Sequence, residues 1–152
     1  MIKSSRIGLI LLAGILAVPA ATASAGAAPV AEAAQPAKLP TDGEVRHAMS
    51  EVRQRLAEAL PALRGGTLDA GGRARLADAI GDQLQKVSAN TRLPDDVRAR
   101  LAQVVASLRT ATASVRTQGA DGLAPMLAAL DSYGRTFDHP GWEDGRLNGD
   151  GR

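Results

Sequence analysis

The chain has 152 residues, with three aromatic residues, no cysteine, and 18 Lys or Arg against 16 Asp or Glu. The lack of cysteine excludes disulfides, thiolate nucleophiles, thiolate metal ligands and a lipid-bearing N-terminal cysteine. If Lys3 and Arg6 are lost with a signal peptide, 16 charges of each sign remain, interspersed without a basic block, which argues against a nucleic-acid partner.

Residues 1–25 have the pattern of a secretory signal peptide. Two cationic residues precede an uninterrupted apolar run, residues 7–18, and a small-residue segment follows, with predicted cleavage after Ala23 or Ala25. The apolar run is shorter than the roughly 20 residues that cross a bilayer. We therefore expect an exported protein, periplasmic or secreted, that has no stable membrane anchor after cleavage.

Two segments of low complexity flank the predicted folded domain, residues 41–142. Residues 26–40 are rich in Ala and Pro and contain few residues that bury apolar surface, which predicts a flexible linker. Residues 143–152 contain three glycines, which predicts a flexible C-terminal tail.

Between these flanks, apolar residues recur at helical spacing in four segments. The first segment has an N-cap at Thr41 or Asp42 and ends at Gly65 and Gly66. Pro61 predicts a kink or an early end of this helix. Its apolar stripe consists of Val45, Met49, Val52, Leu56, Leu60 and Leu63.

The second and third segments have similar boundary signals. The second begins near residues 67–69, and three glycines lower its helix propensity. The third begins at Pro94, with two acidic residues that complement the dipole of its first turn, and ends at Gly119. The two apolar stripes are Leu76, Ile80, Leu84 and Val87, and then Val97, Leu101, Val104, Leu108 and Val115.

The fourth segment has Asp121 as its predicted N-cap and tolerates Pro125 in its first turn. Four helices joined by short turns predict an all-α fold, an antiparallel up-and-down four-helix bundle. A core of Leu, Val and Ala leaves little interior room for a large ligand. The apolar stripe of the fourth helix consists of Leu123, Leu127, Leu130, Gly134 and Phe137.

All three aromatic residues, Tyr133, Phe137 and Trp142, fall within ten residues together with His139, one of two histidines. Tyr133 and Phe137 are four residues apart and share a helical face, and the following Asp-His-Pro-Gly is a helix stop signal. We expect Trp142 to fold back over the open end of the bundle. The alternative is that these aromatic residues form a partner-binding patch.

The candidate metal site consists of Met49 and His139. In an up-and-down bundle the start of the first helix lies beside the end of the fourth, and Met with His is an axial pair for haem iron and a soft pair for copper. Cytochrome b562 has a similar layout. His47 cannot assist Met49, because residues two apart do not face each other on a helix. A haem or copper cofactor is therefore the alternative to a cofactor-free core.

No pattern of catalytic residues is present. The sequence lacks a Gly-x-Ser-x-Gly elbow, its glycine pairs flank predicted helices, and its carboxylates are spread singly over polar faces. We therefore expect a non-catalytic binding or accessory protein, with a periplasmic protein as the candidate partner. The alternative is a stress or chaperone-like protein that works through an exposed apolar groove.

Three motifs carry a resemblance to a known family. They are Thr-Asp…Arg-x-x-Met-x-x-Val-Arg at residues 41–53, the turn at residues 90–94, and Tyr-Gly…Phe-Asp-His-Pro-Gly-Trp at residues 133–142. Together they resemble small exported proteobacterial proteins labelled DnrO-like, which implies an exported helical protein without an established activity. That family pattern has Cys and His where this chain has Thr91 and Ala102, so any function of such a pair is absent here.

Overall fold

The computed structural model describes residues 37–143 and 147, and these residues form an all-α structure. The all-α prediction is therefore confirmed. The predicted signal peptide lies outside the described residues, as do most of the predicted linker and tail. The elements are α1 (Gly43–Arg64), α2 (Ala70–Ala89), α3 (Asp95–Gln118), the 3₁₀ helix η1 (Gly119–Gly122) and α4 (Leu123–Thr136).

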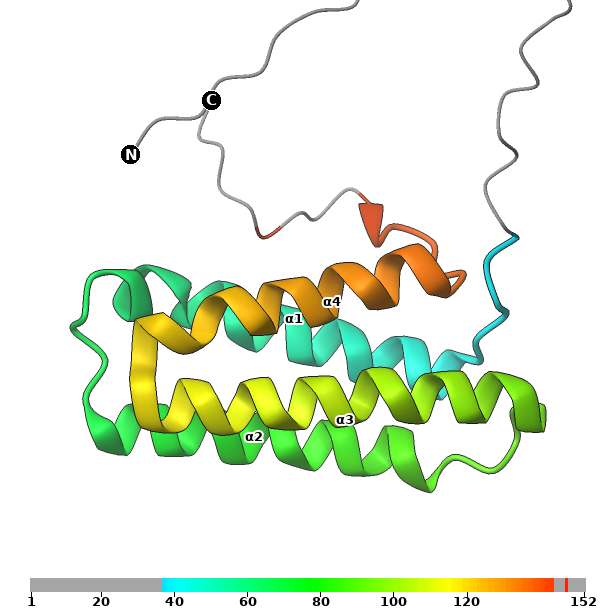
Figure 1. The fold of residues 1–152 in the computed structure, drawn as a ribbon, viewed down its shortest axis with the longest axis horizontal. Helices are drawn as coiled ribbons and strands as arrows, with labels where there is room; N and C mark the ends of the chain where they lie inside the picture. Colours follow the sequence, from blue (N-terminus) through cyan, green and yellow to red (C-terminus); the bar gives the residue numbers. More distant parts are fainter. Residues whose placement is uncertain (1–36, 144–146, 148–152) are drawn as a thin grey trace, which may run out of the picture. The chain divides into compact units, whose positions relative to one another are not determined.

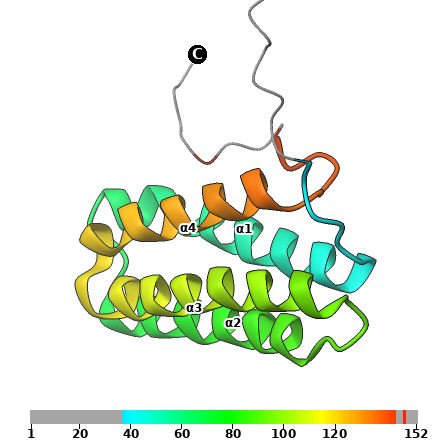
Figure 2. The ribbon, with the colours of Figure 1, turned by 45° about the vertical axis from the view of Figure 1, so that its right-hand side comes forward.

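The helices lie side by side, and the chain reverses direction between consecutive helices (Figures 1 and 2). Each helix packs closely against the next one in sequence, whereas α1 and α4 approach each other less closely. Every residue of the predicted α1 and α3 stripes is buried in one aliphatic core, with Leu76 of α2 and Leu127 of α4 partly buried at its edge. The hydrophobic periodicity therefore identified the core correctly.

Aspartate side chains cap the first two helices. Asp42 Oδ1 accepts a hydrogen bond from the Val45 N–H at 2.8 Å, and Asp69 Oδ1 accepts one from the Gly72 N–H at 2.6 Å. Pro94 precedes α3, whose first turn has no side-chain cap but holds two aspartates that favour the helix dipole. The predicted starts of these helices are confirmed.

Pro61 lies inside α1, which continues to Arg64, so the prediction of an early end at Pro61 is wrong. A proline lacks the N–H that would bond to the preceding turn. The cost is small here, because Pro61 is exposed and the helix ends three residues later. The Gly65 N–H then donates to the Pro61 carbonyl at 2.9 Å, and Gly66 has a positive φ of 65° that closes the turn.

The turn between α3 and α4 contradicts the prediction that Asp121 caps the fourth helix. The 3₁₀ helix η1 leads directly into α4, and Gly122 occupies the capping position without a side-chain cap. A Cβ at Gly122 would lie 2.4 Å from Val115 N, so this turn presses against the backbone of α3. Close backbone packing has replaced the side-chain cap.

α4 ends at Thr136, one residue before Phe137, which the sequence placed on its helical stripe. Phe137 has an extended backbone (φ −114°, ψ 143°) and forms an isolated parallel bridge with Leu39. The Leu39 N–H donates to the Thr136 carbonyl and the Asp138 N–H donates to the Leu39 carbonyl, both at 2.8 Å. Leu39, predicted as part of the flexible linker 26–40, is thus fixed, because it pairs with a carbonyl that the helix end leaves free.

Gly81 should lower the stability of α2, and no close packing contact requires a glycine at this position. It lies in the middle of the helix, and a Cβ there would meet nothing within 4 Å. Because glycine loses more backbone freedom on folding than alanine, Gly81→Ala should raise the free energy of unfolding by about 0.5–1 kcal/mol. Urea unfolding followed by circular dichroism measures the change. A lower free energy of unfolding in the variant would contradict this view of Gly81.

Candidate functional site

The aromatic residues form a cluster at the end of α4. Residues 137–143, which we name the C-terminal clasp, leave α4 and contact α1. Tyr133 stacks on Phe137 with ring centroids 5.2 Å apart and meets Trp142 edge-on at 4.7 Å. All three rings are buried, and the most accessible of them, Trp142, is only 8% exposed. These side chains therefore belong to the interior and leave little aromatic surface for a partner.

Trp142 lies on α4 at a position where only glycine leaves room. A Cβ at Gly134 would lie 2.3 Å from Trp142 Cδ1. The Arg53 guanidinium of α1 lies over the indole, 4.7 Å from the ring centroid, and donates to the Trp142 carbonyl at 2.8 Å. The indole is therefore held by both α4 and α1.

His139 connects the C-terminal clasp to two helices. Its Nδ1 lies 3.1 Å from the Tyr133 hydroxyl of α4, and its Nε2 lies 3.2 Å from the Ser50 hydroxyl of α1. A neutral imidazole donates from one nitrogen and accepts at the other, and either hydroxyl can complement it. Both ring nitrogens of neutral His139 are therefore engaged.

The surroundings of His139 favour its neutral form. Burial lowers the pKa of His139 below its ordinary value of 6.5, the positive charges of Arg53 and Arg46 lower it further, and Asp138 opposes them. Burial raises the pKa of Tyr133 far above its ordinary value, so the phenol stays protonated. At neutral pH the hydrogen-bonded pair of His139 and Tyr133 is therefore uncharged.

A second set of contacts fixes the start of α1. The Thr41 hydroxyl donates to the Asp138 carbonyl at 2.6 Å, and Asn90 Nδ2 donates to Asp42 Oδ2 at 2.6 Å. Burial by itself would raise the pKa of Asp42, but hydrogen bonds from the Val45 N–H and the Asn90 side chain outweigh it and lower the pKa. The charged carboxylate thus joins the start of α1 to the loop before α3.

The hydrogen bonds of His139 go to Ser50 and Tyr133, and not to Met49. Met49 is fully buried in the aliphatic core, and the neighbouring residue on α1, Ser50, reaches the imidazole. A metal at His139 would have to displace one of the two hydroxyls. In the part of the chain that the structure describes, no group of three or more His, Asp or Glu side chains is placed to hold a metal ion. His47 lies exposed on α1, outside this cluster.

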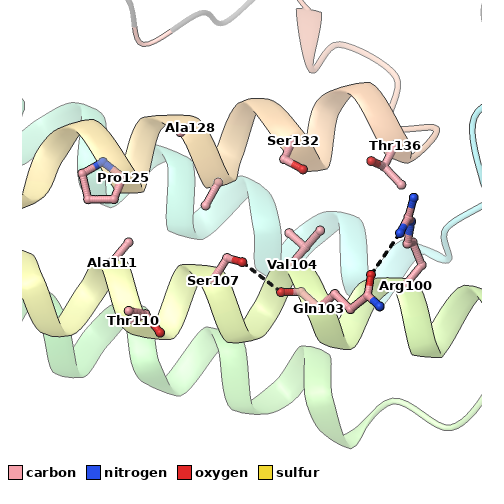
Figure 3. A pocket seen from close by; sticks show the side chains of 11 residues that line it. Arg100, Gln103, Val104, Ser107, Thr110, Ala111, Pro125, Ala128, Ser132 and Thr136 are labelled. Atoms are coloured by element: carbon pink, nitrogen blue, oxygen red, sulfur yellow. Dashed lines mark hydrogen bonds between the residues drawn. The ribbon is translucent and has the colours of Figure 1, made fainter.

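A groove runs between α3 and α4 (Figure 3). Its volume of about 680 Å³ lies within the range of about 300–1,000 Å³ that small-molecule sites occupy. Side chains from both helices line it, and most of them are small or hydroxylated. The lining residues are Arg100, Gln103, Val104, Ser107, Thr110, Ala111, Pro125, Ala128, Ala129, Ser132 and Thr136.

The groove between α3 and α4 has walls of mixed polarity and has its only charged lining side chain at one end. Arg100 extends from α3 toward Thr136 at the end of α4, and its Nη1 donates to Gln103 Oε1 at 3.0 Å (Figure 3). The Ser107 hydroxyl donates to the Gln103 carbonyl at 3.1 Å, which leaves lone pairs on its oxygen to accept from a ligand. The groove therefore offers hydroxyl oxygens along its length and a cation at one end.

Sequence reasoning missed this groove because its residues are individually uninformative. Alanine, serine and threonine on a helix predict only an exposed face. One signal was available: residues 97–120 contain four arginines and no acidic residue, in a chain whose charges are otherwise mixed. A surface groove is also compatible with the filled aliphatic core that the composition predicted.

Thr91 and Ala102, the positions at which the DnrO-like pattern has Cys and His, line one smaller pocket of about 280 Å³ beside the loop between α2 and α3. The two positions are therefore close in space. Neither side chain is a metal ligand of the thiolate or imidazole type. The chain has no equivalent of that pair at this pocket.

Comparison with known proteins does not assign the chain to a family. No protein-family model, no curated protein and no solved structure matches it. Within residues 37–143, no helix is both long and apolar enough to cross a membrane. The function must therefore be argued from the geometry of the site.

Gly134→Ala should loosen the C-terminal clasp. The added methyl group would overlap the indole of Trp142, so the ring must move, and we expect a loss of about 1–3 kcal/mol in the free energy of unfolding. Trp142 is the only tryptophan of the chain, so its emission should shift to the red as it becomes hydrated.

Gly81→Ala is the matched control for this substitution, because it adds the same methyl group to a helix without overlap. Equal stability and unchanged emission in Gly134→Ala would show that Trp142 does not depend on the space beside Gly134.

Proposed function

We propose that the protein is an exported, non-catalytic binding protein that accepts a small organic ligand in the groove between α3 and α4. The observation that carries this proposal is the groove itself. It has a volume of about 680 Å³, small and hydroxylated walls, and Arg100 at one end. Sites with these properties bind small molecules by shape and by a few polar contacts.

An antiparallel up-and-down four-helix bundle is the architecture that we propose for this protein. The side-by-side order of α1 to α4 and the short connections between them support it. Bundles of this kind build ligand sites from side chains on facing helices. The export that we propose rests on the signal-peptide pattern of residues 1–25.

The chemistry of the groove between α3 and α4 favours binding over catalysis. Its lining includes no histidine and no carboxylate, so it offers no general acid or base suited to neutral pH. A serine or threonine without an adjacent base is a weak nucleophile. A bound molecule would therefore be held without being transformed.

Arg100 gives the proposed ligand an orientation. In the described part of the chain Arg100 forms no ion pair, and its hydrogen bond goes to the neutral Gln103 amide. A guanidinium binds a carboxylate with two parallel hydrogen bonds. We therefore propose that the ligand carries an anionic group and lies with that group beside Arg100.

The alternative functions have less support. A haem or copper site at Met49 and His139 would need a hydroxyl to leave His139, and Met49 is fully buried in the aliphatic core. A chaperone-like role would need a groove with continuous apolar walls, whereas the apolar side chains of this groove alternate with serines and threonines. We also propose kinship with the DnrO-like proteins, on the strength of the motifs at residues 41–53 and 133–142.

Ligand-observed NMR with a library of small carboxylic acids and their neutral amides tests the groove. We expect acids to bind and their amides to bind about 10-fold or more weakly, because a hydrogen bond to a charged group contributes about 1.5–3 kcal/mol. Ala128→Phe fills the groove and should abolish binding.

Ala57→Phe is the control for the groove variant, because Ala57 is exposed on α1 and does not line the groove. Hits that persist in Ala128→Phe, or that are lost equally in Ala57→Phe, would refute the groove as the binding site. A library without any hit would refute the proposed ligand class.

The mass of the exported protein tests the proposed localisation. In a bacterial host that expresses the full chain, the periplasmic fraction should contain a protein that begins at Ser24 or Gly26, because the small residues at 23 and 25 fit signal peptidase. A double substitution of Leu11 and Leu12 by Arg should leave the protein uncleaved in the cytoplasm. Recovery of the unaltered chain in the cytoplasm at full length would overturn the proposal of export.

A further inference from the structure

The C-terminal clasp is attached to the rest of the protein by polar contacts that surround one titratable side chain. The Thr41 hydroxyl and the Arg53 guanidinium bond to clasp carbonyls at Asp138 and Trp142. His139 lies between these attachments and reaches both α1 and α4. Residues before α1 add further attachments, because Leu39 pairs with Phe137 and Lys38 forms an ion pair with Glu143. His139 is the titratable clasp side chain that bonds to α1 and α4 at once.

Protonation would change the hydrogen bonding of His139. The neutral ring needs one acceptor and one donor, which the Ser50 and Tyr133 hydroxyls supply. The imidazolium donates from both nitrogens, so the hydroxyl that donates to the neutral ring would have to turn and accept instead. Unless that hydroxyl turns, one of the two hydrogen bonds of the ring is lost on protonation.

The charges that face His139 resist protonation. Arg46 and Arg53 approach from α1, Tyr133 of α4 is neutral, and Asp138 is the carboxylate whose charge opposes the two arginines. Asp138 is exposed, so solvent and salt screen its charge more than they screen contacts in the interior. A half-buried imidazolium would therefore be poorly compensated while the clasp stays closed.

We propose that the C-terminal clasp is an acid-sensitive latch, in which protonation of His139 releases residues 137–143 from α1. Release hydrates the imidazolium and moves it away from Arg46 and Arg53. It also removes Trp142 from Gly134 and uncovers Tyr133 and the adjoining face of α1. This inference is independent of the proposed ligand groove, which lies between α3 and α4.

The pH range in which the clasp should open follows from the direction in which the His139 pKa is shifted. The pKa of His139 is lower in the closed clasp than in a hydrated histidine, whose value is 6.5. The closed state therefore has its full stability above about pH 6.5 and loses stability as the pH falls through the lower pKa of the closed clasp. A titration that starts at pH 8 and descends through pH 6.5 enters this range from the closed state.

Two measurements on the purified protein follow the latch. Acrylamide quenching reports the accessibility of Trp142, the only tryptophan of the chain. Hydrogen exchange reports the Asp138 amide, which donates from the clasp to the Leu39 carbonyl at 2.8 Å in the closed state. We expect both to increase below pH 6.5 while the helical circular dichroism stays constant. The opening equilibrium should rise about tenfold for each pH unit between the two pKa values.

His139→Gln is the decisive variant, because glutamine offers one donor and one acceptor but cannot become charged in this range. It should abolish the acid transition of Trp142, and His47→Gln, which changes the exposed histidine of α1, should preserve it. NMR titration of the His139 imidazole in the unaltered protein provides a test that needs no variant. The His139 pKa should lie below 6.5, the ordinary value of histidine.

Several results would overturn the latch. One is an acid transition that persists in His139→Gln or disappears in His47→Gln. Another is titration of His139 without a change in exchange of the Asp138 amide. Loss of helical circular dichroism together with clasp opening would show global acid unfolding, which also contradicts the proposal.

Discussion

The packing of Trp142 on Gly134 is the contact on which this end of the protein depends. α1 and α4 approach each other less closely than consecutive helices do, and Trp142 contacts both of them, through Arg53 and Gly134. Each buried aromatic ring removes about 150–250 Å² from water, so the three buried rings contribute strongly to the packing at this end. Glycine at 134 is required because the indole occupies the volume of a Cβ.

This packing explains why the polar groups of the C-terminal clasp bond to other parts of the protein. Buried rings bring His139 and the clasp backbone to the surface of α1, where their polar groups need partners. The partners are Ser50 and Arg53 of α1, together with Thr41, which precedes α1. Arg46 and Arg53, two of the arginines that make the composition look basic, bind carbonyls and an indole here.

The groove between α3 and α4 has a different origin. Small side chains on both helices leave a depression at the surface, and the core beneath it stays aliphatic and filled. Hydroxyls that bond back to their own helix place polar atoms between the apolar side chains without closing the space, as Ser107 does with the Gln103 carbonyl. The protein therefore separates a closed aromatic cluster from an open groove of mixed polarity, with different helix pairs forming each.

The sequence by itself determined the helices and the core, because both follow from local patterns: the spacing of Val45 to Leu63, the caps at Asp42 and Asp69, and the glycines after α1. It also located the aromatic residues within one stretch. Tertiary structure decided the features that depend on contacts between distant residues. The backbone at Gly122 packs against α3, so α4 begins without a cap from Asp121. Leu39 pairs with Phe137, and the residue of α1 that bonds to His139 is Ser50 and not Met49. Such contacts depend on how far apart two helices lie and which faces they present, and no periodicity within one helix encodes that distance.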